Sequence, residues 1–177
     1  MDSIQHIYIA NINRIFAQYK KIGEGAIEQI NNEEINFCPD KESNSIALIV
    51  KHLSGNMLSR WTDFFLSDGE KEWRKRDTEF EGTFRDKKQL IEVWTKGWNC
   101  LFNVTEKLKP EDLLKTVSIR GEELTVLDAI NRQIAHYSYH VGQMVYLSKH
   151  IRSSNWKSLS IPKGQSNQYN NQKTKQK

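Results

Sequence analysis

The sequence predicts an all-α protein in which four long helices form a four-helix bundle. Four stretches place apolar residues near the helical period of about 3.6 residues. Only nine Gly and three Pro occur in 177 residues, which favours long regular elements over many short strands. A long connector separates the second stretch from the third. Because a long connector permits parallel neighbours while short ones give antiparallel neighbours, we expect an up-down-down-up order with the crossover between helices two and three.

The first helix is expected over residues 3–30, where Ile, Phe and Tyr recur at helical spacing. Gly23 and Gly25 weaken its later part, because glycine is a poor helix former. Residues 31–44 then form a connector, since Pro39 cannot continue a helix interior.

The second helix is expected over residues 45–66, with Ser43 or Asn44 as its cap and Gly69 in the usual terminating role. Residues 68–85 follow as a connector rich in charge, and a loop of this length is often functional. Its charges are most simply a solvated face. Its aromatic side chains indicate that the connector packs on the body; they are Trp73, Phe80 and Phe84.

The third helix is expected over residues 86–108, ahead of Pro110. Residues 115–126, KTVSIRGEELTV, alternate apolar and polar side chains around Arg120 and Gly121. This alternation predicts either a small hairpin or an extended turn.

The fourth helix is expected from Thr125 to His150, and Thr125 with Asp128 resembles a capping box. The chain beyond Arg152 is rich in Ser, Asn, Gln and Lys, which predicts disorder. We therefore expect two parts, a helical body over residues 1–152 and a basic tail over 153–177.

The tail accounts for the basic balance of the chain. It holds five Lys and no acidic residue, so its charge is +5, and subtracting this from the formal net charge of +4 leaves the body at −1. A nearly neutral body argues against a broad nucleic-acid-binding face. Nucleic-acid binding through the lysine tail is the weaker alternative.

The compartment predicted from the sequence is the cytoplasm. The N-terminal stretch MDSIQHIYIAN lacks the basic start and long apolar run of a signal peptide. No window approaches the roughly 18 apolar residues of a membrane span. Cys38 and Cys100 are expected to be free thiols, as in reduced cytosolic proteins.

Three histidines carry most of the functional information. His136 and His140 are four residues apart in the stretch INRQIAHYSYHVGQMVYL, so their imidazoles lie on one helix face. Two ligands do not satisfy a zinc-like ion, which usually takes three protein ligands when one position stays open for chemistry. His52 is the best remaining candidate, because His6 and His150 lie near helix ends.

Spacing alone leaves the alternatives open. A single histidine such as His52 is more often an ordinary surface or hydrogen-bonded residue. The segment HYSYH also lacks the glutamate that makes the HExxH pattern of zinc proteases specific. The pattern alone therefore fits a metal site and two ordinary histidines equally well.

Helical projection places the three histidines at the edges of two buried stripes. His136 and His140 lie to one side of the expected stripe of the fourth helix; the stripe comprises Leu127, Ile130, Ile134, Tyr137, Val141, Val145 and Ser148. His52 is offset in the same way on the second helix. If the two edges face each other, three imidazoles converge at a partly open cleft, as metal sites in bundles do.

The order of a single His in helix two, a long crossover and HxxxH in the last helix resembles the DinB/YfiT-like superfamily of metal-dependent proteins. The stretch SNSIALIVKHLSGNMLSRWTDFFLSDGEKEWRKRDTEF is similar to an uncharacterised bacterial branch of it. The resemblance covers roughly residues 1–152. It implies a four-helix bundle, a homodimer and a divalent metal held by His52, His136 and His140. Some relatives are thiol-dependent S-transferases or isomerases that use bacillithiol, mycothiol or glutathione.

Two functions follow as expectations. The first is a metal-dependent transferase or hydrolase, in which zinc or nickel lowers the pKa of a bound thiol or water for attack on a small electrophile. Asn56, Arg60 and Asp63 follow His52 along the helix and could orient imidazoles or hold an anionic cosubstrate. No residue qualifies as a general base, so the catalytic residues stay unassigned. The second is a non-catalytic, stress-linked dimeric module whose metal is structural.

Overall fold

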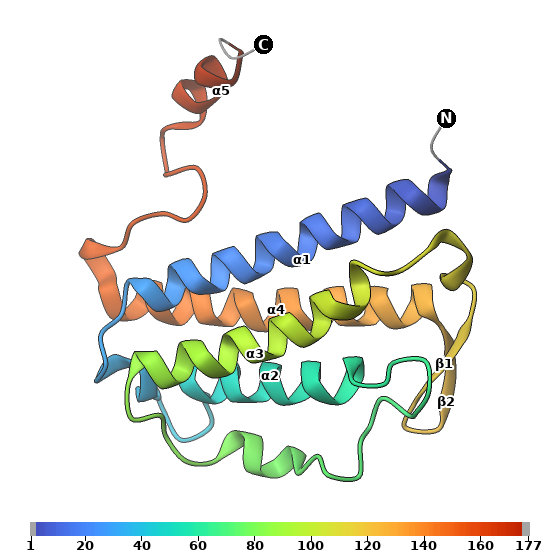
Figure 1. Ribbon diagram of the computed structural model, residues 1–177. Helices are drawn as coiled ribbons and strands as arrows, with labels where there is room; N and C mark the ends of the chain where they lie inside the picture. Colours follow the sequence, from blue (N-terminus) through green and yellow to red (C-terminus); the bar gives the residue numbers. More distant parts are fainter. Residues whose placement is uncertain (1–2, 175–177) are drawn as a thin grey trace.

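Four long helices and a small hairpin make up the body of the protein. The computed structural model describes residues 3–174. The helices are α1 (Ile4–Glu28), α2 (Ile46–Trp61), α3 (Lys87–Thr105), α4 (Val126–Arg152) and α5 (Ser166–Thr174), and the strands are β1 (Thr116–Ile119) and β2 (Glu122–Thr125). Short 3₁₀ segments include η2 (Arg76–Phe80). The predicted helical class is confirmed, with one two-stranded antiparallel sheet added (Figure 1).

The four long helices lie side by side. α1 contacts α4 and α3, and α2 contacts α3 and α4. α2 and α3 run in one direction while α1 and α4 run in the other (Figure 1). Within residues 3–174, none of the helices combines the length and the apolar character that a bilayer crossing requires.

The core is centred on one aromatic side chain from each long helix. Phe16 of α1, Trp61 of α2, Trp98 of α3 and Tyr137 of α4 are all fully buried. Phe16 packs against the other three rings and Trp98 packs against Tyr137, with ring centroids 5.8–6.4 Å apart, within the usual range for aromatic pairs. This cluster fixes how α2 and α4 face each other.

The second helix is shorter than predicted. It ends at Trp61 rather than Leu66, because Asp63 adopts a left-handed backbone with φ of 49°. Its cap is Ser45, whose hydroxyl accepts from the amide of Leu48, instead of Ser43 or Asn44. Gly69 does not terminate the helix; its amide donates to the Ser118 carbonyl at 2.7 Å and so joins the connector to β1.

The hairpin alternative for residues 115–126 is confirmed. β1 pairs with β2 through a two-residue turn in which Arg120 and Gly121 both have positive φ, as a type I′ turn requires. The amides of both turn residues donate to the carboxylate of Asp68 at 2.8 Å. The hairpin is thereby fastened to the connector, and Thr125 caps α4 through the Asp128 amide as predicted.

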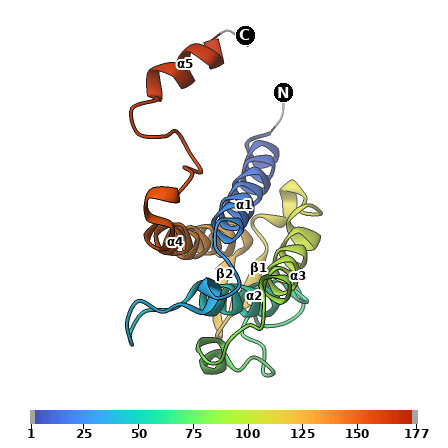
Figure 2. The ribbon, with the colours of Figure 1, turned by 90° about the vertical axis from the view of Figure 1, so that its left-hand side faces the viewer.

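Beyond Arg152 the chain first returns to α1. The Gln29 side chain donates to the carbonyl of Lys157 and accepts from its amide, at 3.0 and 2.7 Å. α5 then occupies part of the segment that was expected to be disordered. It extends away from the four long helices in both views (Figures 1 and 2), and the side chains described there are exposed. The division at residue 152 stays a prediction.

Candidate metal centre

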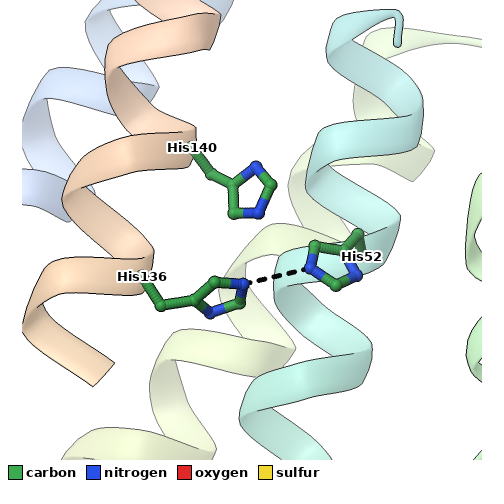
Figure 3. A group of neighbouring side chains, drawn as sticks. All are labelled: His52, His136 and His140. Carbon is green, nitrogen blue, oxygen red and sulfur yellow. Dashed lines mark hydrogen bonds between the residues drawn. The ribbon is translucent and has the colours of Figure 1, made fainter. Parts of the chain in front are cut away.

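The structure brings the three predicted histidines together. His52 projects from α2 toward His136 and His140 on α4 (Figure 3). One nitrogen of each imidazole lies within 4.8 Å of the others, and the Nε2 atoms of His52 and His136 are 3.1 Å apart. Among residues 3–174, this is the group of His, Cys, Asp or Glu side chains whose geometry could hold a metal ion.

His52 is held by a buried carboxylate from the connector. Its Nδ1 lies 2.9 Å from Oε2 of Glu79, and Arg74 donates to both oxygens of that carboxylate at 2.8 and 2.9 Å. Burial alone would raise the pKa of Glu79, but the hydrogen bonds from His52 and Arg74 outweigh it and hold the pKa below its usual value. The ionised carboxylate accepts a hydrogen bond from Nδ1–H of His52, so Nε2 presents its lone pair to the other histidines.

Phe80 and Lys51 strengthen this arrangement. The Phe80 ring stacks on His52 with centroids 4.8 Å apart. The ammonium of Lys51 on α2 donates to the carbonyls of Thr78 and Glu81, which fastens η2 along the helix. The connector therefore packs on the body at the site, as its aromatic residues predicted, although Trp73 is exposed.

The two histidines of α4 have weaker support. Nδ1 of His140 lies 2.8 Å from Oε1 of Gln143, whereas buried Nδ1 of His136 has no partner among the described residues. Burial, followed by the charge of His140, lowers the pKa of His136 to about 3. Burial and the charge of His52 lower the pKa of His140 to about 4. Both imidazoles are neutral near pH 7, which is the form that binds metals.

The histidine side of α4 is more buried than the helical projection suggested. Gln133, His140 and Met144 are buried, while Ile134 and Val145 are only partly so. The reason is that α2 covers α4 on the histidine side while α1 covers it on another. The buried stripe is thus shifted toward the histidines.

A cavity of about 380 Å³ opens beside the three imidazoles. Its wall is drawn from α2, the connector, the hairpin turn and α4. The side chains that line it are His52, Asn56, Arg60, Arg74, Arg76, Phe80, Arg120, Arg132, Gln133, His136, Tyr139 and His140. The group is therefore accessible to a small molecule from one side.

Two of the three residues predicted to accompany His52 line this cavity. Asn56 accepts from the hydroxyl of Tyr137, which ties the cavity wall to the aromatic core. Arg60 donates to the Gly69 carbonyl and to Glu70. Asp63 does not reach the site: it is exposed just beyond the end of α2 and lines a different cavity. The early end of α2 is the physical reason.

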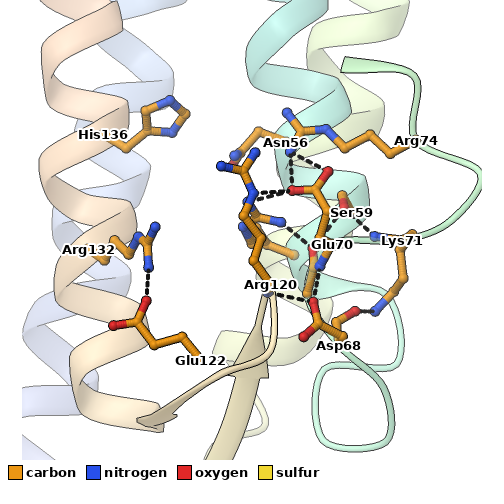
Figure 4. A network of polar contacts seen from close by, with 12 residues as sticks. Asn56, Ser59, Asp68, Glu70, Lys71, Arg74, Arg120, Glu122, Arg132 and His136 are labelled. Carbon is orange, nitrogen blue, oxygen red and sulfur yellow. Dashed lines mark hydrogen bonds and ion pairs between the residues drawn. The ribbon is translucent and has the colours of Figure 1, made fainter. Parts of the chain in front are cut away.

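Part of the connector charge forms a partly buried network, whereas Glu72, Lys75, Arg76 and Asp77 are exposed, as expected for a solvated face. The Glu70 carboxylate is shared by Arg60, Arg74 and Arg120. Figure 4 labels Glu70 with Arg74 and Arg120. Lys71 is buried, and its amide donates to the Ser59 hydroxyl at 3.1 Å. These contacts draw residues 68–80 against α2 and bring arginines to the cavity.

Sequence reasoning missed Glu79, although one signal for it was present. Gly55 lies inside α2, where glycine costs roughly 1 kcal/mol relative to alanine. A Cβ at this position would lie 2.2 Å from Oε1 of Glu79. A glycine inside a helix pattern can thus indicate the close approach of another segment.

The donor set fits a borderline divalent ion. Two imidazole nitrogens that share a tetrahedral zinc ion lie about 3.3 Å apart, since each Zn–N bond is about 2.0–2.1 Å. The separation of 3.1 Å between His52 and His136 agrees with this value, and the three nitrogens, within 4.8 Å of one another, would draw closer to share one ion. Hydrogen bonds at the Nδ1 atoms of His52 and His140 leave both Nε2 atoms available for the ion.

Comparison with known proteins gives a match to a protein family. A family model described as a protein of unknown function (DUF1572) matches residues 3–165. The match spans α1–α4, the connector and all three histidines, and it extends past Arg152 into the segment that returns to α1. No curated protein matches the chain.

Proposed function

The chain belongs to the DUF1572 family, and from this premise and the converged imidazoles we propose that the protein binds a divalent transition metal through His52, His136 and His140. The observation that carries the proposal is the approach of three imidazole nitrogens to within 4.8 Å of one another at an accessible cavity. Imidazole ligands suit zinc, nickel, copper and iron. Zinc or nickel is the ion that we propose.

We further propose an enzyme of the DinB/YfiT-like type, a thiol-dependent S-transferase or a related activity. The helix directions support this assignment as an up-down-down-up bundle with residues 62–86 as the crossover. When bound, the ion would lower the pKa of a thiol or water and so supply a nucleophile near neutral pH. A low-molecular-weight thiol and a small electrophile are the proposed substrates.

The chain's own residues have defined tasks in this proposal. Glu79 and Gln143 hold the Nδ1 protons of His52 and His140, which orients the imidazoles. Phe80 restricts rotation of the His52 ring by stacking on it. Asn56 and Arg60 line the cavity as groups that can orient a substrate.

The accessible cavity favours an enzyme over a structural metal site. Structural zinc sites are closed by four protein ligands, whereas catalytic sites keep one position open. The histidine group comprises three side chains among residues 3–174, and the cavity lies beside it. The alternative is a non-catalytic, stress-linked module. The homodimer, the cytoplasmic location and the division into a body of residues 1–152 and a basic tail belong to the same proposal.

Metal content of the purified protein tests the metal site. Wild-type protein loaded with zinc or nickel and then desalted should retain one ion per chain, and His136→Ala should lose it. His150→Ala is the matched control, because His150 is an exposed residue of the same helix. An unchanged metal content in His136→Ala, or no metal in loaded wild-type protein, would rule out the proposed site.

A second experiment separates the enzyme from the non-catalytic module. Loaded and metal-free protein are assayed with bacillithiol, mycothiol or glutathione and a small alkylating electrophile. Metal-dependent consumption of thiol supports the transferase. Metal binding without turnover of any combination of thiol and electrophile supports the non-catalytic module.

A further inference from the structure

The cavity beside the histidines has a second property, an excess of positive charge. Among the described residues, its charged lining consists of five arginines and no carboxylate; they are Arg60, Arg74, Arg76, Arg120 and Arg132. They come from α2, the connector, the hairpin turn and α4. Segments that are distant in the sequence thus all contribute arginine side chains to this one cavity.

Two of these arginines are committed to the protein. The side chains of Arg60 and Arg74 are only 6% and 2% exposed. Arg60 bonds to the Gly69 carbonyl and Glu70, and Arg74 bonds to Glu70 and Glu79. Because Glu70 also pairs with Arg120, one carboxylate is shared among three guanidinium groups. The protein's own carboxylates therefore do not fully neutralise the arginines of the cavity.

The other three arginines are partly exposed, so a ligand can reach them. The side chains of Arg76, Arg120 and Arg132 are 49%, 53% and 47% exposed. Arg132 pairs with exposed Glu122, and Arg76 pairs at 3.8 Å with an almost fully exposed Asp77 (the Arg132–Glu122 and Arg120–Glu70 pairs appear in Figure 4). Exposed ion pairs of this kind contribute little free energy, so a ligand can replace them.

We propose that the cavity binds a small substrate with a doubly negative end, formed by carboxylate groups or by one phosphate. Its anionic end lies among Arg76, Arg120 and Arg132, and its reacting end lies at the histidines. The guanidinium fork favours carboxylate and phosphate because it donates two parallel hydrogen bonds to them. A volume of about 380 Å³ suits a metabolite-sized molecule. Only the placement of the reacting end rests on the proposed metal function, since the arginines do not depend on an ion.

Calorimetric titration of simple dianions tests the inference. Succinate and inorganic phosphate are titrated into metal-free and zinc-loaded protein at low ionic strength. At least one should bind the metal-free form with a dissociation constant of about 1 mM or tighter. The double variant Arg120→Gln/Arg132→Gln should weaken that binding by roughly tenfold or more, because hydrogen bonds to charged groups are lost. Uncharged succinamide should not bind.

The controls make each outcome decisive. Arg14→Gln changes an exposed arginine of α1 outside the cavity, and it should bind the dianion as wild type does. Circular dichroism checks folding, and Arg120→Lys/Arg132→Lys provides a second variant that keeps charge but loses the forks. Preference for succinate assigns a carboxylate substrate, and preference for phosphate assigns a phosphate ester.

The inference fails if neither dianion binds the metal-free form, or if both double variants bind as tightly as wild type. This failure is distinct from failure of the metal site. Zinc content and its dependence on His136 are measured on the same preparations. If the dianion binds but wild-type protein loaded with zinc retains none, the anion site stands and the metal function fails.

Discussion

The three imidazoles differ in how firmly the rest of the protein holds them. His52 of α2 donates to buried Glu79, and Arg74 donates hydrogen bonds to both oxygens of that carboxylate. On α4, His140 donates to the neutral side chain of Gln143, and Nδ1 of His136 has no partner among the described residues. The helix that contributes one ligand is thus supported by charged groups, while the helix that contributes two is not.

This difference follows from where each ligand comes from. The backbone of one helix already fixes His136 and His140 relative to each other, because residues four apart lie one turn apart on the same face. His52 comes from another helix, so its position depends on contacts outside α2. The connector after α2 supplies them through Arg74, Glu79 and Phe80. The connector is therefore part of the site as well as a link between helices.

Arg74→Met should have the largest effect, because it removes the partner of the carboxylate that holds His52. The side chains of Arg74 and Glu79 are 2% and 8% exposed, so the change leaves a buried carboxylate without its main partner. We expect the free energy of unfolding in urea to fall by about 3 kcal/mol or more. Arg74→Met/Glu79→Gln should recover part of this loss, because the uncompensated charge is gone. Arg85→Met, at an 81% exposed side chain, should change stability by less than about 0.5 kcal/mol. A double variant no more stable than Arg74→Met would contradict the account.

Glu79→Gln should weaken metal binding while the fold remains. The amide oxygen can still accept from His52, but it lacks the charge that favours the Nδ1 proton. Loss of such a partner typically reduces metal affinity by about 10–100-fold. Competition with a chromophoric zinc chelator measures the change. Glu81→Gln, at an exposed neighbour in the same connector, serves as the matched control. Equal affinities for the two variants would show that Glu79 has no role at the metal.

Gly55→Ala should also disturb the contact between Glu79 and His52, but through a change on α2 instead of in the connector. The added methyl group would lie 2.2 Å from Oε1 of Glu79, so the carboxylate must shift from the position in which Arg74 bonds to it. We expect zinc affinity to fall by roughly tenfold, the lower limit for loss of an outer partner. Gly142→Ala on α4 is the control, because a Cβ there meets no atom within 4 Å. That variant should gain up to about 1 kcal/mol of stability from helix propensity. A similar gain in Gly55→Ala with unchanged zinc affinity would contradict the proposed contact.

The sequence was informative wherever a local rule governs the structure. Helical periodicity located all four long helices, and Thr125 was correctly predicted as the cap of α4. The pair spacing placed His136 and His140 on one face, and projection placed His52 at the edge of its own buried stripe, an edge that the structure turns toward them. Each of these predictions depends on residues within a few positions of one another, for which backbone geometry is nearly fixed.

Contacts made by the connector were beyond such rules. No spacing relates Glu79 to His52, since the connector has no regular period and its path depends on burial and on ion pairs. The charges of residues 70–76 were interpreted as solvated because their sequence does not show that Glu70 and Arg74 turn inward. Asp63 was misplaced for a related reason, because the left-handed backbone that ends α2 has no distinct sequence signal. Gly55 was the one local clue to the approach of another segment.

Gln143→Ala tests the weaker side of the comparison and should have the smallest effect. Gln143 is only partly buried, so water can replace its oxygen as the acceptor for Nδ1 of His140. The spacing along α4 also keeps His140 in place without it. We expect zinc affinity to fall by less than about tenfold, below the range for loss of an ordered outer partner. The same chelator competition measures this, with Glu79→Gln alongside. If Gln143→Ala loses as much affinity as Glu79→Gln, the two helices hold their ligands equally firmly. The charged support of His52 would then require an explanation other than ligand orientation, such as placement of the connector arginines around the cavity.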